Sequence, residues 1–265
     1  MSGFATFFEN YGHWTILLIA VLAFVAGFID AIVGGGGLIQ VPALLIAFPA
    51  IPLPVLFGTN KIAALAGTLT ATLKYARRIR FDVPVLLLIA ACCFASSFVG
   101  ARLVSHLDSH KLKPVILLIL TGIAIYTLFH KNLGAAKSKD LTRGRQMLYG
   151  GMIGLLVGFY DGFFGPGTGS FFVLGFVVIL GFEFVKASAY AKVVNCVTNL
   201  SALTVFISKG YFILPLAIVM TIFNMTGSYL GSHLALTKGN GFVRIMFLVI
   251  VGIMICKFGY DLCFG

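Results

Sequence analysis

Long apolar runs alternate with short polar segments along most of the chain. Most of these runs reach or approach the ~20 residues that a helix needs to cross the hydrocarbon core of a bilayer. The pattern predicts an all-α, polytopic membrane protein. The uncharged runs are Trp14–Ile29, Val83–Ala101, Val115–Phe129, Met147–Tyr160, Phe212–Leu230 and Ile245–Cys256.

The composition supports this reading. Hydrophobic residues make up 60% of the chain and charged residues only 10%, whereas soluble domains carry about 25% charged residues. The net charge of +11 would also suit a nucleic-acid-binding protein, but the basic residues lie in short loops, as the positive-inside rule predicts. We therefore expect a multi-pass protein of the inner (plasma) membrane with the lipid bilayer as partner and no nucleic acid.

The basic loops also predict the orientation. Two apolar segments, roughly 83–104 and 113–130, separate the first two basic clusters, so both clusters face the same side of the membrane. We expect this side to be the cytoplasm. The first apolar run has no cationic segment before it and is interpreted as a retained span. The cytoplasmic basic residues are Lys74, Arg77, Arg78, Arg80, Lys131, Lys137, Lys139, Arg143, Arg145, Lys186, Lys238 and Arg244.

The sequence contains an internal duplication. Asp30 lies at the end of an apolar run and is followed by glycines, and Asp161 repeats this pattern 131 residues later. The same offset relates Lys61 to Lys192 and continues without a gap to Gly100 and Gly231. The duplicated feature is a charged residue and a glycine-rich break inside a predicted membrane segment.

Each copy is predicted to contain about five segments: four long helices and one short helix or half-helix. The short segment lies at about 38–48 in the first copy and at about 169–181 in the second. An odd number of crossings inserts the second copy upside down, as in many secondary transporters. We therefore predict two inverted-topology repeats with glycine breaks near the midplane. The expected organisation is a first transmembrane repeat at 1–130, a cytoplasmic linker at 131–146 and a second repeat at 147–265.

Four ionisable residues fall inside predicted membrane helices: Asp30, Lys61, Asp161 and Lys192. Such a charge costs at least ~2.5 kcal/mol at the bilayer centre, so these residues usually pair or line an aqueous pathway. Each lysine follows the aspartate of its own repeat by 31 positions and is taken as its partner. The alternative is that two structural Asp–Lys pairs only hold the repeats together.

Glycine-rich runs follow both aspartates. Glycine permits unusual backbone angles and brings N–H groups to a surface, and the short helix that follows adds its positive N-terminal dipole. This arrangement favours a bound anion. A soluble dinucleotide-type loop is excluded because no strand precedes either run. The predicted donors are Gly34, Gly35, Gly36, Gly37, Gly165, Gly167 and Thr168.

Polar side chains accompany each lysine. Asn60 precedes Lys61, and Asn195 and Asn199 share a helix face near Lys192 because residues three and four apart are neighbours on a helix. An ammonium group with amide donors suits a small oxyanion. We therefore predict an anion-binding site of glycine N–H groups, both lysines and these three asparagines, with helix–helix hydrogen bonding as the alternative role of the polar residues.

Catalytic and metal sites are not expected. No Ser/His/Asp or Cys/His set lies among the predicted spans, so the chain does not read as an enzyme. His106 and His110 are four apart, but no third ligand lies near them, so no metal and no other cofactor is expected. Stripes of small residues such as Gly150, Gly154 and Gly158 favour close helix packing inside the bundle over a homodimer contact.

Several of these segments resemble the TauE/SafE family of membrane exporters, in particular its YfcA-type branch. The matching segments are Phe28–Leu38 with Pro42, Gly58–Lys61, Gly158–Pro166 with Gly169–Phe171, and Ala191–Lys192 with Asn195 and Thr198–Asn199. They occur in order across both halves of the chain. The resemblance implies an inner-membrane exporter of sulfite or of organosulfur anions such as sulfoacetate.

We therefore predict a secondary exporter that binds a small anionic substrate between two repeats and works by alternating access. Asp30 and Asp161 would carry a coupling proton or hold the lysines in place. Two alternatives stay open: a cation-coupled or cation transporter whose ligands are Asp30 and Asp161, and a membrane scaffold without transport. A homodimer is the common expectation for the oligomeric state.

Overall fold

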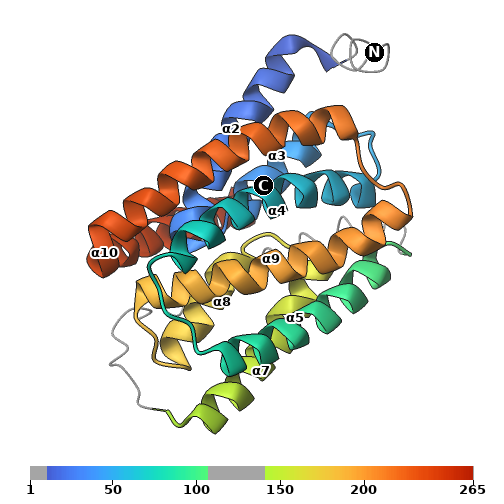
Figure 1. Cartoon of the computed structure of the whole chain (residues 1–265). Coiled ribbons are helices and arrows are strands. Elements are labelled where there is room, and N and C mark those ends of the chain that lie inside the picture. Colours follow the sequence, from blue (N-terminus) through green and yellow to red (C-terminus); the bar gives the residue numbers. More distant parts are fainter. Residues whose placement is uncertain (1–10, 107–140, 265) are drawn as a thin grey trace.

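The computed structural model describes residues 11–106 and 141–264, and its regular secondary structure there is entirely helical. The predicted all-α class is confirmed for this part of the chain. The expected span at 113–130 and most of the linker at 131–146 lie outside it. The helices are α2 His13–Val33, α3 Gly37–Ala47, α4 Leu53–Ala76, α5 Val83–Val104, α7 Arg143–Phe163, α8 Thr168–Val178, α9 Phe184–Ser208 and α10 Leu214–Phe264 (Figure 1).

Within the described residues, four helical segments are long and apolar enough to cross a membrane: α2, α5, α9 and the Leu214–Phe247 part of α10. The 21 residues of α2 extend about 31 Å at 1.5 Å per residue, close to the thickness of the hydrocarbon core. Helix α4 is less apolar because it carries polar residues such as Thr59, Asn60 and Lys61 along its length. Most of this polar set is buried, so α4 has an internal position in the bundle.

Glycines separate each long helix from the short helix that follows. Helix α2 ends at Val33, where Gly34 adopts a φ of 80°, and α3 begins at Gly37. Helix α7 ends at Phe163, and α8 begins after Gly167, which adopts a φ of 82°. The short predicted segments thus correspond to α3 and α8, each an apolar helix of 11 residues.

Helix α10 contains a break at Gly239, where φ is 73° and ψ is −164°. A backbone at this ψ cannot continue the α-helical hydrogen-bond pattern. The break therefore divides α10 into two helical parts, which correspond to the two plain spans that the sequence predicts after the second lysine helix.

The six longer helices of the described chain form two groups of three, and each group combines both halves of the sequence. Helices α2 and α4 pack with α10, whereas α7 and α9 pack with α5, and the groups meet where α4 contacts α9 (Figure 1). Helix α5 therefore packs mainly with helices of the second half of the chain, and α10 packs mainly with helices of the first half. This exchange brings residues from both halves to the centre.

Equivalent positions of the two halves make equivalent contacts. The Ile213 N–H donates to Thr59 Oγ1 at 2.9 Å, and the Asp82 N–H donates to the Tyr190 hydroxyl oxygen at 2.7 Å. Thr59 and Tyr190 are 131 residues apart, as are Asp82 and Ile213. Both hydrogen bonds therefore join one half of the chain to the other at matched positions.

Small residues occupy matched helix crossings. A Cβ on Gly100 would lie 2.3 Å from the Phe159 carbonyl oxygen, and a Cβ on Gly231 would lie 2.3 Å from that of Phe28. Both pairs again differ by the 131-residue offset. No Cβ fits at such distances, so these glycines allow α5 to approach α7 and α10 to approach α2. Their contacts are inside the chain, as favoured from the sequence, and the homodimer stays a prediction.

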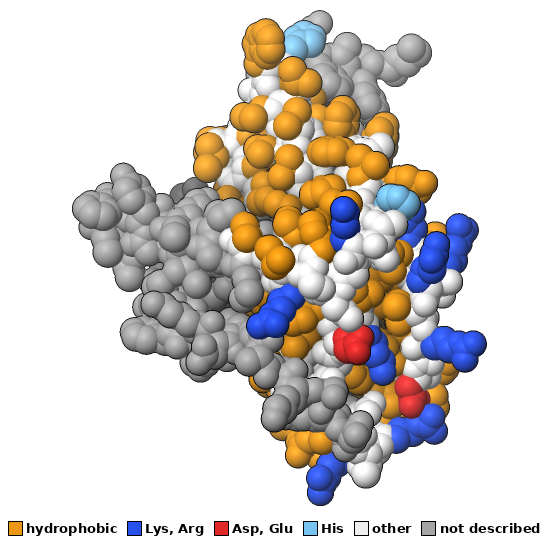
Figure 2. All heavy atoms as spheres, turned by 90° about the vertical axis from the view of Figure 1, so that its left-hand side faces the viewer, with side chains coloured by type: hydrophobic (Ala, Val, Ile, Leu, Met, Phe, Trp, Pro, Cys, Tyr) orange, Lys and Arg blue, Asp and Glu red, His pale blue; other side chains and the backbone are white. Residues whose placement is uncertain are grey.

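The outer surface is apolar, with basic residues gathered towards one end. Side chains such as Trp14, Ile46 and Leu156 are 83%, 80% and 72% exposed, which fits a lipid-facing surface. Figure 2 shows Lys and Arg side chains over the lower part of one face, below an apolar region. The exposed Arg143 guanidinium contacts the Asp82 carboxylate at 2.9 Å. The assignment of this end to the cytoplasm stays a prediction.

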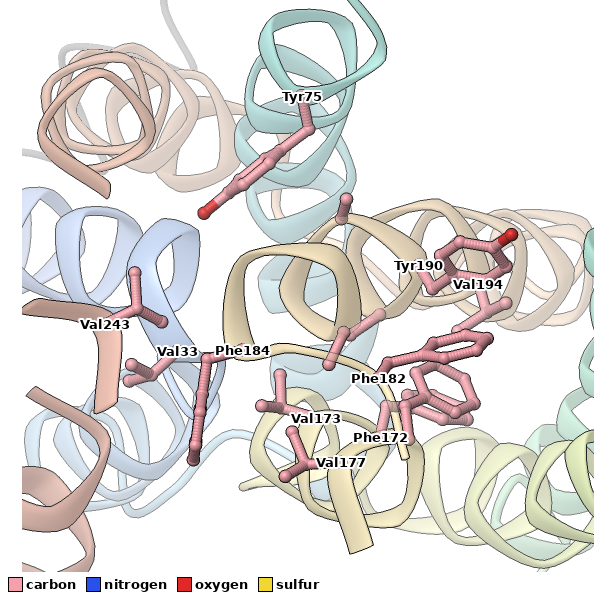
Figure 3. Close-up of a cluster of buried hydrophobic side chains, with 14 of the residues drawn as sticks. Val33, Tyr75, Phe172, Val173, Val177, Phe182, Phe184, Tyr190, Val194 and Val243 are labelled. Atoms are coloured by element: carbon pink, nitrogen blue, oxygen red, sulfur yellow. The ribbon is translucent and has the colours of Figure 1, made fainter. Parts of the chain in front are cut away.

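An aromatic core holds α8 against α9. Phe172 and Val173 of α8 are fully buried, as is Tyr190 of α9, and Phe182 lies between these helices in sequence (Figure 3). The ring centroids of Phe182 and Tyr190 are 4.9 Å apart, and the ring centroids of Phe176 and Tyr190 are 6.3 Å apart. This packing fixes the start of α8 relative to the polar face of α9.

Candidate functional site

A polar cavity lies where the two glycine-rich breaks approach each other. The space between its walls, together with open solvent at the mouth, is about 440 Å³, and helices from both halves line it. Its walls consist of glycines, amides, hydroxyls and charged groups, with one alanine. The lining residues are Asp30, Gly35, Gly36, Gly37, Gln40, Asn60, Lys61, Ala64, Thr68, Asp161, Gly165, Gly167, Thr168, Gly169, Asn195, Asn199 and Asn224.

The cavity brings together most of the residues that the sequence singles out. Asp30, Asp161, Lys61, the three predicted asparagines, Thr168 and most of the predicted glycines line it. Gly34 and Lys192 do not. Gly34 packs against the backbone of Gly169, and the fully buried Lys192 side chain contacts Asp30.

The two buried ion pairs cross between the halves of the chain. Lys61 Nζ lies 2.8 Å from Asp161 Oδ1, and Lys192 Nζ lies 2.8 Å from Asp30 Oδ2. The prediction that each lysine pairs with the aspartate of its own repeat is therefore wrong. The reason is the exchanged packing: α4 and α9 lie side by side at the centre, and each lysine extends to the first long helix of the other half.

The glycine-rich breaks contact each other through their backbones. A Cβ on Gly34 would lie 2.1 Å from the carbonyl carbon of Gly169, and a Cβ on Gly37 would lie 3.2 Å from Pro166 Cα. Gly165 lies against the first ion pair, because its Cβ would be 3.4 Å from Lys61 Nζ. The start of α3 and the start of α8 thus meet at the cavity, which concentrates two positive helix ends there.

Several predicted backbone donors already have acceptors within the protein. The Gly34 N–H donates to the Asp30 carbonyl oxygen at 2.8 Å, and the Gly165 N–H donates to the Tyr160 carbonyl oxygen at 3.2 Å. The Gly36 N–H donates to Asp30 Oδ1 at 3.3 Å. For the described residues, this leaves the N–H groups of Gly35, Gly37 and Gly167 without a protein acceptor.

The cavity wall also contains Thr68 of the first lysine helix and Gly169 of the second glycine-rich run, and the structure adds two residues that the sequence did not indicate, Gln40 and Asn224. The Asn224 amide Nδ2 donates to Gln40 Oε1 at 3.2 Å. The duplication could not identify this pair, because the matching positions in the other repeat are Phe171 and Cys93. The sequence did contain a signal: Gln40 is a lone amide side chain in a short apolar segment. A polar side chain there costs free energy in a membrane unless it has a polar partner.

Three buried polar atoms of the cavity wall have no hydrogen-bond partner in the described chain. They are Gln40 Nε2, Asn60 Oδ1 and Asp161 Oδ2. An unmade hydrogen bond of a buried group costs about 1–3 kcal/mol, and more for a charged group. The cavity therefore presents unfilled hydrogen-bonding capacity on several sides, as a binding site for a small polar solute would.

Among the described residues, no group of three or more His, Cys, Asp or Glu side chains could hold a metal ion. His106, one member of the histidine pair considered from the sequence, lies near Lys209, with 3.3 Å between His106 Nε2 and Lys209 Nζ. His110 lies outside the described residues.

Comparison with known proteins identifies similar chains. Residues 19–258 match the family described as "Sulfite exporter TauE/SafE". A "Probable membrane transporter protein" of Haemophilus influenzae is 37% identical over 92% of this chain and 95% of its own. A "Probable membrane transporter protein YfcA" of Escherichia coli K12 is 39% identical over 92% of this chain and 91% of its own. No solved structure gives a significant match.

Proposed function

The chain belongs to the TauE/SafE family of membrane transporters, and on that basis we propose that it exports a small oxyanion across the inner membrane. Sulfite and organosulfonates such as sulfoacetate are the proposed substrates. The family description names sulfite export. The similar chains are described only as probable membrane transporters, so the proposal depends on the chemistry of the cavity.

The observation that carries the proposal is the position of Lys61. Its side chain is largely buried, lines the polar cavity and lies 2.8 Å from Asp161. Asn60, Asn195 and Asn199 lie around the same cavity. An ammonium group with amide donors can hold the oxygens of a small oxyanion through charge-assisted hydrogen bonds.

The charge balance of the site also favours an anion. The four buried charges, two lysines and two aspartates, sum to zero. The N–H groups of Gly35, Gly37 and Gly167 and the positive ends of α3 and α8 add attraction for negative charge. The cavity thus attracts anions more strongly than the four side chains alone would.

We propose that the two halves are inverted repeats that work by alternating access. Three features support this: the 131-residue offset, the crossed ion pairs and the matched contacts between the halves. In this arrangement α3 and α8 are half-helices whose starts meet near the midplane. Motion of α2, α4 and α10 against α7, α9 and α5 would expose the cavity to either side in turn.

Anion efflux from proteoliposomes tests the proposal. Vesicles loaded with sulfite or sulfoacetate should release the anion only when they contain the protein. Lys61→Gln should lower the rate about 100-fold, since Lys61 is the only cationic side chain among the described residues that line the cavity, and charge-assisted hydrogen bonds in such sites are worth about 1.5–3 kcal/mol each. Lys74→Gln on the same helix, outside the cavity, should leave the rate within about twofold, because Lys74 contacts only the carbonyl oxygen and ring of Tyr229 among the described residues.

Three outcomes would contradict the proposal. The first is the absence of sulfite and sulfoacetate efflux from wild-type vesicles. The second is cation flux that persists in Lys61→Gln, which would favour a cation transporter. The third is unchanged anion efflux in Lys61→Gln, which would leave the cavity without the proposed role.

Gln40 provides a second test of the same cavity. Gln40→Leu should weaken the apparent affinity for the transported anion by about tenfold, because it removes a hydrogen bond worth about 1.5 kcal/mol. The protein should remain folded, since the Asn224 amide that loses Gln40 Oε1 as its acceptor also lines the polar cavity, where water can replace this hydrogen bond. Gln146→Leu is the matched control, because the Gln146 amide bonds to the Leu141 carbonyl oxygen near the start of α7. Equal affinities for both variants would exclude Gln40 from the binding site.

A further inference from the structure

The two buried ion pairs differ in how completely their carboxylates are satisfied. Both oxygens of Asp30 have donors, Lys192 Nζ at 2.8 Å and the Gly36 N–H at 3.3 Å. Only one oxygen of Asp161 has a donor, Lys61 Nζ at 2.8 Å. Asp161 Oδ2 is buried and has no partner in the described chain.

The two lysines also differ in their access to the cavity. Lys192 is fully buried and does not line the cavity, whereas Lys61 lines it. Asp30 is the more exposed carboxylate, at 15% of its side chain against 3% for Asp161. Exposure alone would therefore favour Asp30 as the group that takes up a proton, but each oxygen of Asp30 already has a donor, and Asp30 holds a lysine that has no other partner among the described residues.

From this asymmetry, and on the basis of the proposed function, we infer that the two pairs have different roles. The Lys192–Asp30 pair is a permanent link between α9 and α2. The Lys61–Asp161 pair opens during transport: Lys61 transfers its hydrogen bond from Asp161 to the bound anion, and Asp161 Oδ2 takes up one proton that hydronium delivers from the aqueous phase, leaving a neutral water molecule. The sequence treats the pairs as equivalent, so this assignment comes from the structure alone.

The exchange is balanced in charge and in hydrogen bonds. Before binding, the two lysines and two aspartates sum to zero. A monovalent anion adds one negative charge, and the proton on Asp161 adds one positive charge, so the buried site stays neutral. The protonated Oδ2 becomes a hydroxyl donor, and an oxygen of the bound anion in the same cavity can accept its hydrogen bond, whereas burying an unpaired charge would be far more costly. One proton therefore accompanies each monovalent anion.

Asp30 is the other carboxylate among the described residues that line the cavity, and each of its oxygens already has a donor. Lys61 faces Asp161 from α4, the Cys93 thiol lies near Asp161 on α5, and the Tyr160 hydroxyl is adjacent on α7 but donates to the Pro166 carbonyl oxygen at 2.6 Å. Helix α8 has no titratable residue. Helix α9 contributes Asn195 and Asn199 to the cavity, while Lys192 is held by Asp30, the remaining carboxylate of the lining.

The matched variants Asp161→Asn and Asp30→Asn test this assignment. Asp161→Asn resembles the protonated state, so the protein should fold, bind the anion and transport it without a proton. Its flux should become independent of the pH gradient and sensitive to the membrane potential, whereas wild-type flux of a monovalent anion shows the reverse. Asp30→Asn leaves the fully buried Lys192 without its carboxylate, and the yield of folded protein should fall about tenfold below that of Asp161→Asn.

The measurements are made in proteoliposomes loaded with hydrogensulfite at mildly acidic pH or with methanesulfonate, with a pH-sensitive dye inside and valinomycin to set the potential. Wild-type flux of either anion is established first, and its absence contradicts the proposed function itself. If the wild type transports but moves no protons, or if Asp161→Asn keeps proton-coupled flux, the division of roles is overturned while the transport function stands. Equal loss of folded protein in both variants would overturn it as well.

Discussion

Lys192→Asp should eliminate almost all folded protein. The variant would place two carboxylates close together in a fully buried position, where Lys192 now contacts Asp30 at 2.8 Å. Breaking a buried ion pair costs about 3–5 kcal/mol, and like charges add to that cost. Because proteins have about 5–15 kcal/mol of stability in total, we expect little monodisperse protein in detergent. Size-exclusion chromatography of a fluorescent fusion measures this directly.

The partner reversals identify which residues pair. The double variant Asp30→Lys with Lys192→Asp should recover at least about tenfold more folded protein than either single variant, because opposite charges face each other again. Asp30→Lys with Lys61→Asp should not recover, although Lys61 is the lysine of the same repeat. Recovery with Lys61→Asp instead would show that the pairs lie within the repeats.

The pairing of the aspartates with the lysines shows how far the sequence alone could predict the site. Uncharged runs, one duplicated offset and the high cost of intramembrane charge were sufficient to identify Asp30, Asp161, Lys61 and Lys192. Their pairing was predicted incorrectly, since sequence separation within a repeat favours neighbours along the chain. The actual partners depend on α5 and α10 exchanging places between the halves, which is a tertiary feature that no local pattern encodes.

The hydrogen-bonded amides of Gln40 and Asn224 show a second limit of predicting the site from the sequence. Repetition was the main signal for the site, and it can only find residues that both copies keep. Gln40 and Asn224 form a hydrogen bond across the cavity wall, yet their counterparts are Phe171 and Cys93. The sequence thus predicted the features that the two halves share, whereas the features that make them different, including the free oxygen of Asp161, required the structure.

Gly34→Ala should also abolish the folded transporter, for a steric reason. Gly34 adopts a φ of 80°. A Cβ on Gly34 would lie 2.1 Å from the carbonyl carbon of Gly169 and 2.4 Å from the backbone nitrogen of Ser170. The methyl group would meet backbone rather than a movable side chain, so the two glycine-rich breaks would have to separate. Because those breaks form the cavity, we expect both folded yield and anion efflux to fall below about a tenth of wild type.

Gly210→Ala separates this clash from backbone strain. Gly210 adopts a φ of 68°, similar to that of Gly34, but nothing lies within 4 Å of its Cβ position. The strain of a left-handed alanine is about 1–2 kcal/mol and should lower Tm by only a few degrees with efflux preserved. Equal effects of both substitutions would mean that backbone strain, rather than contact between the breaks, sets the requirement for glycine. A large effect confined to Gly34 would show that the cavity depends on two backbones touching where no side chain fits.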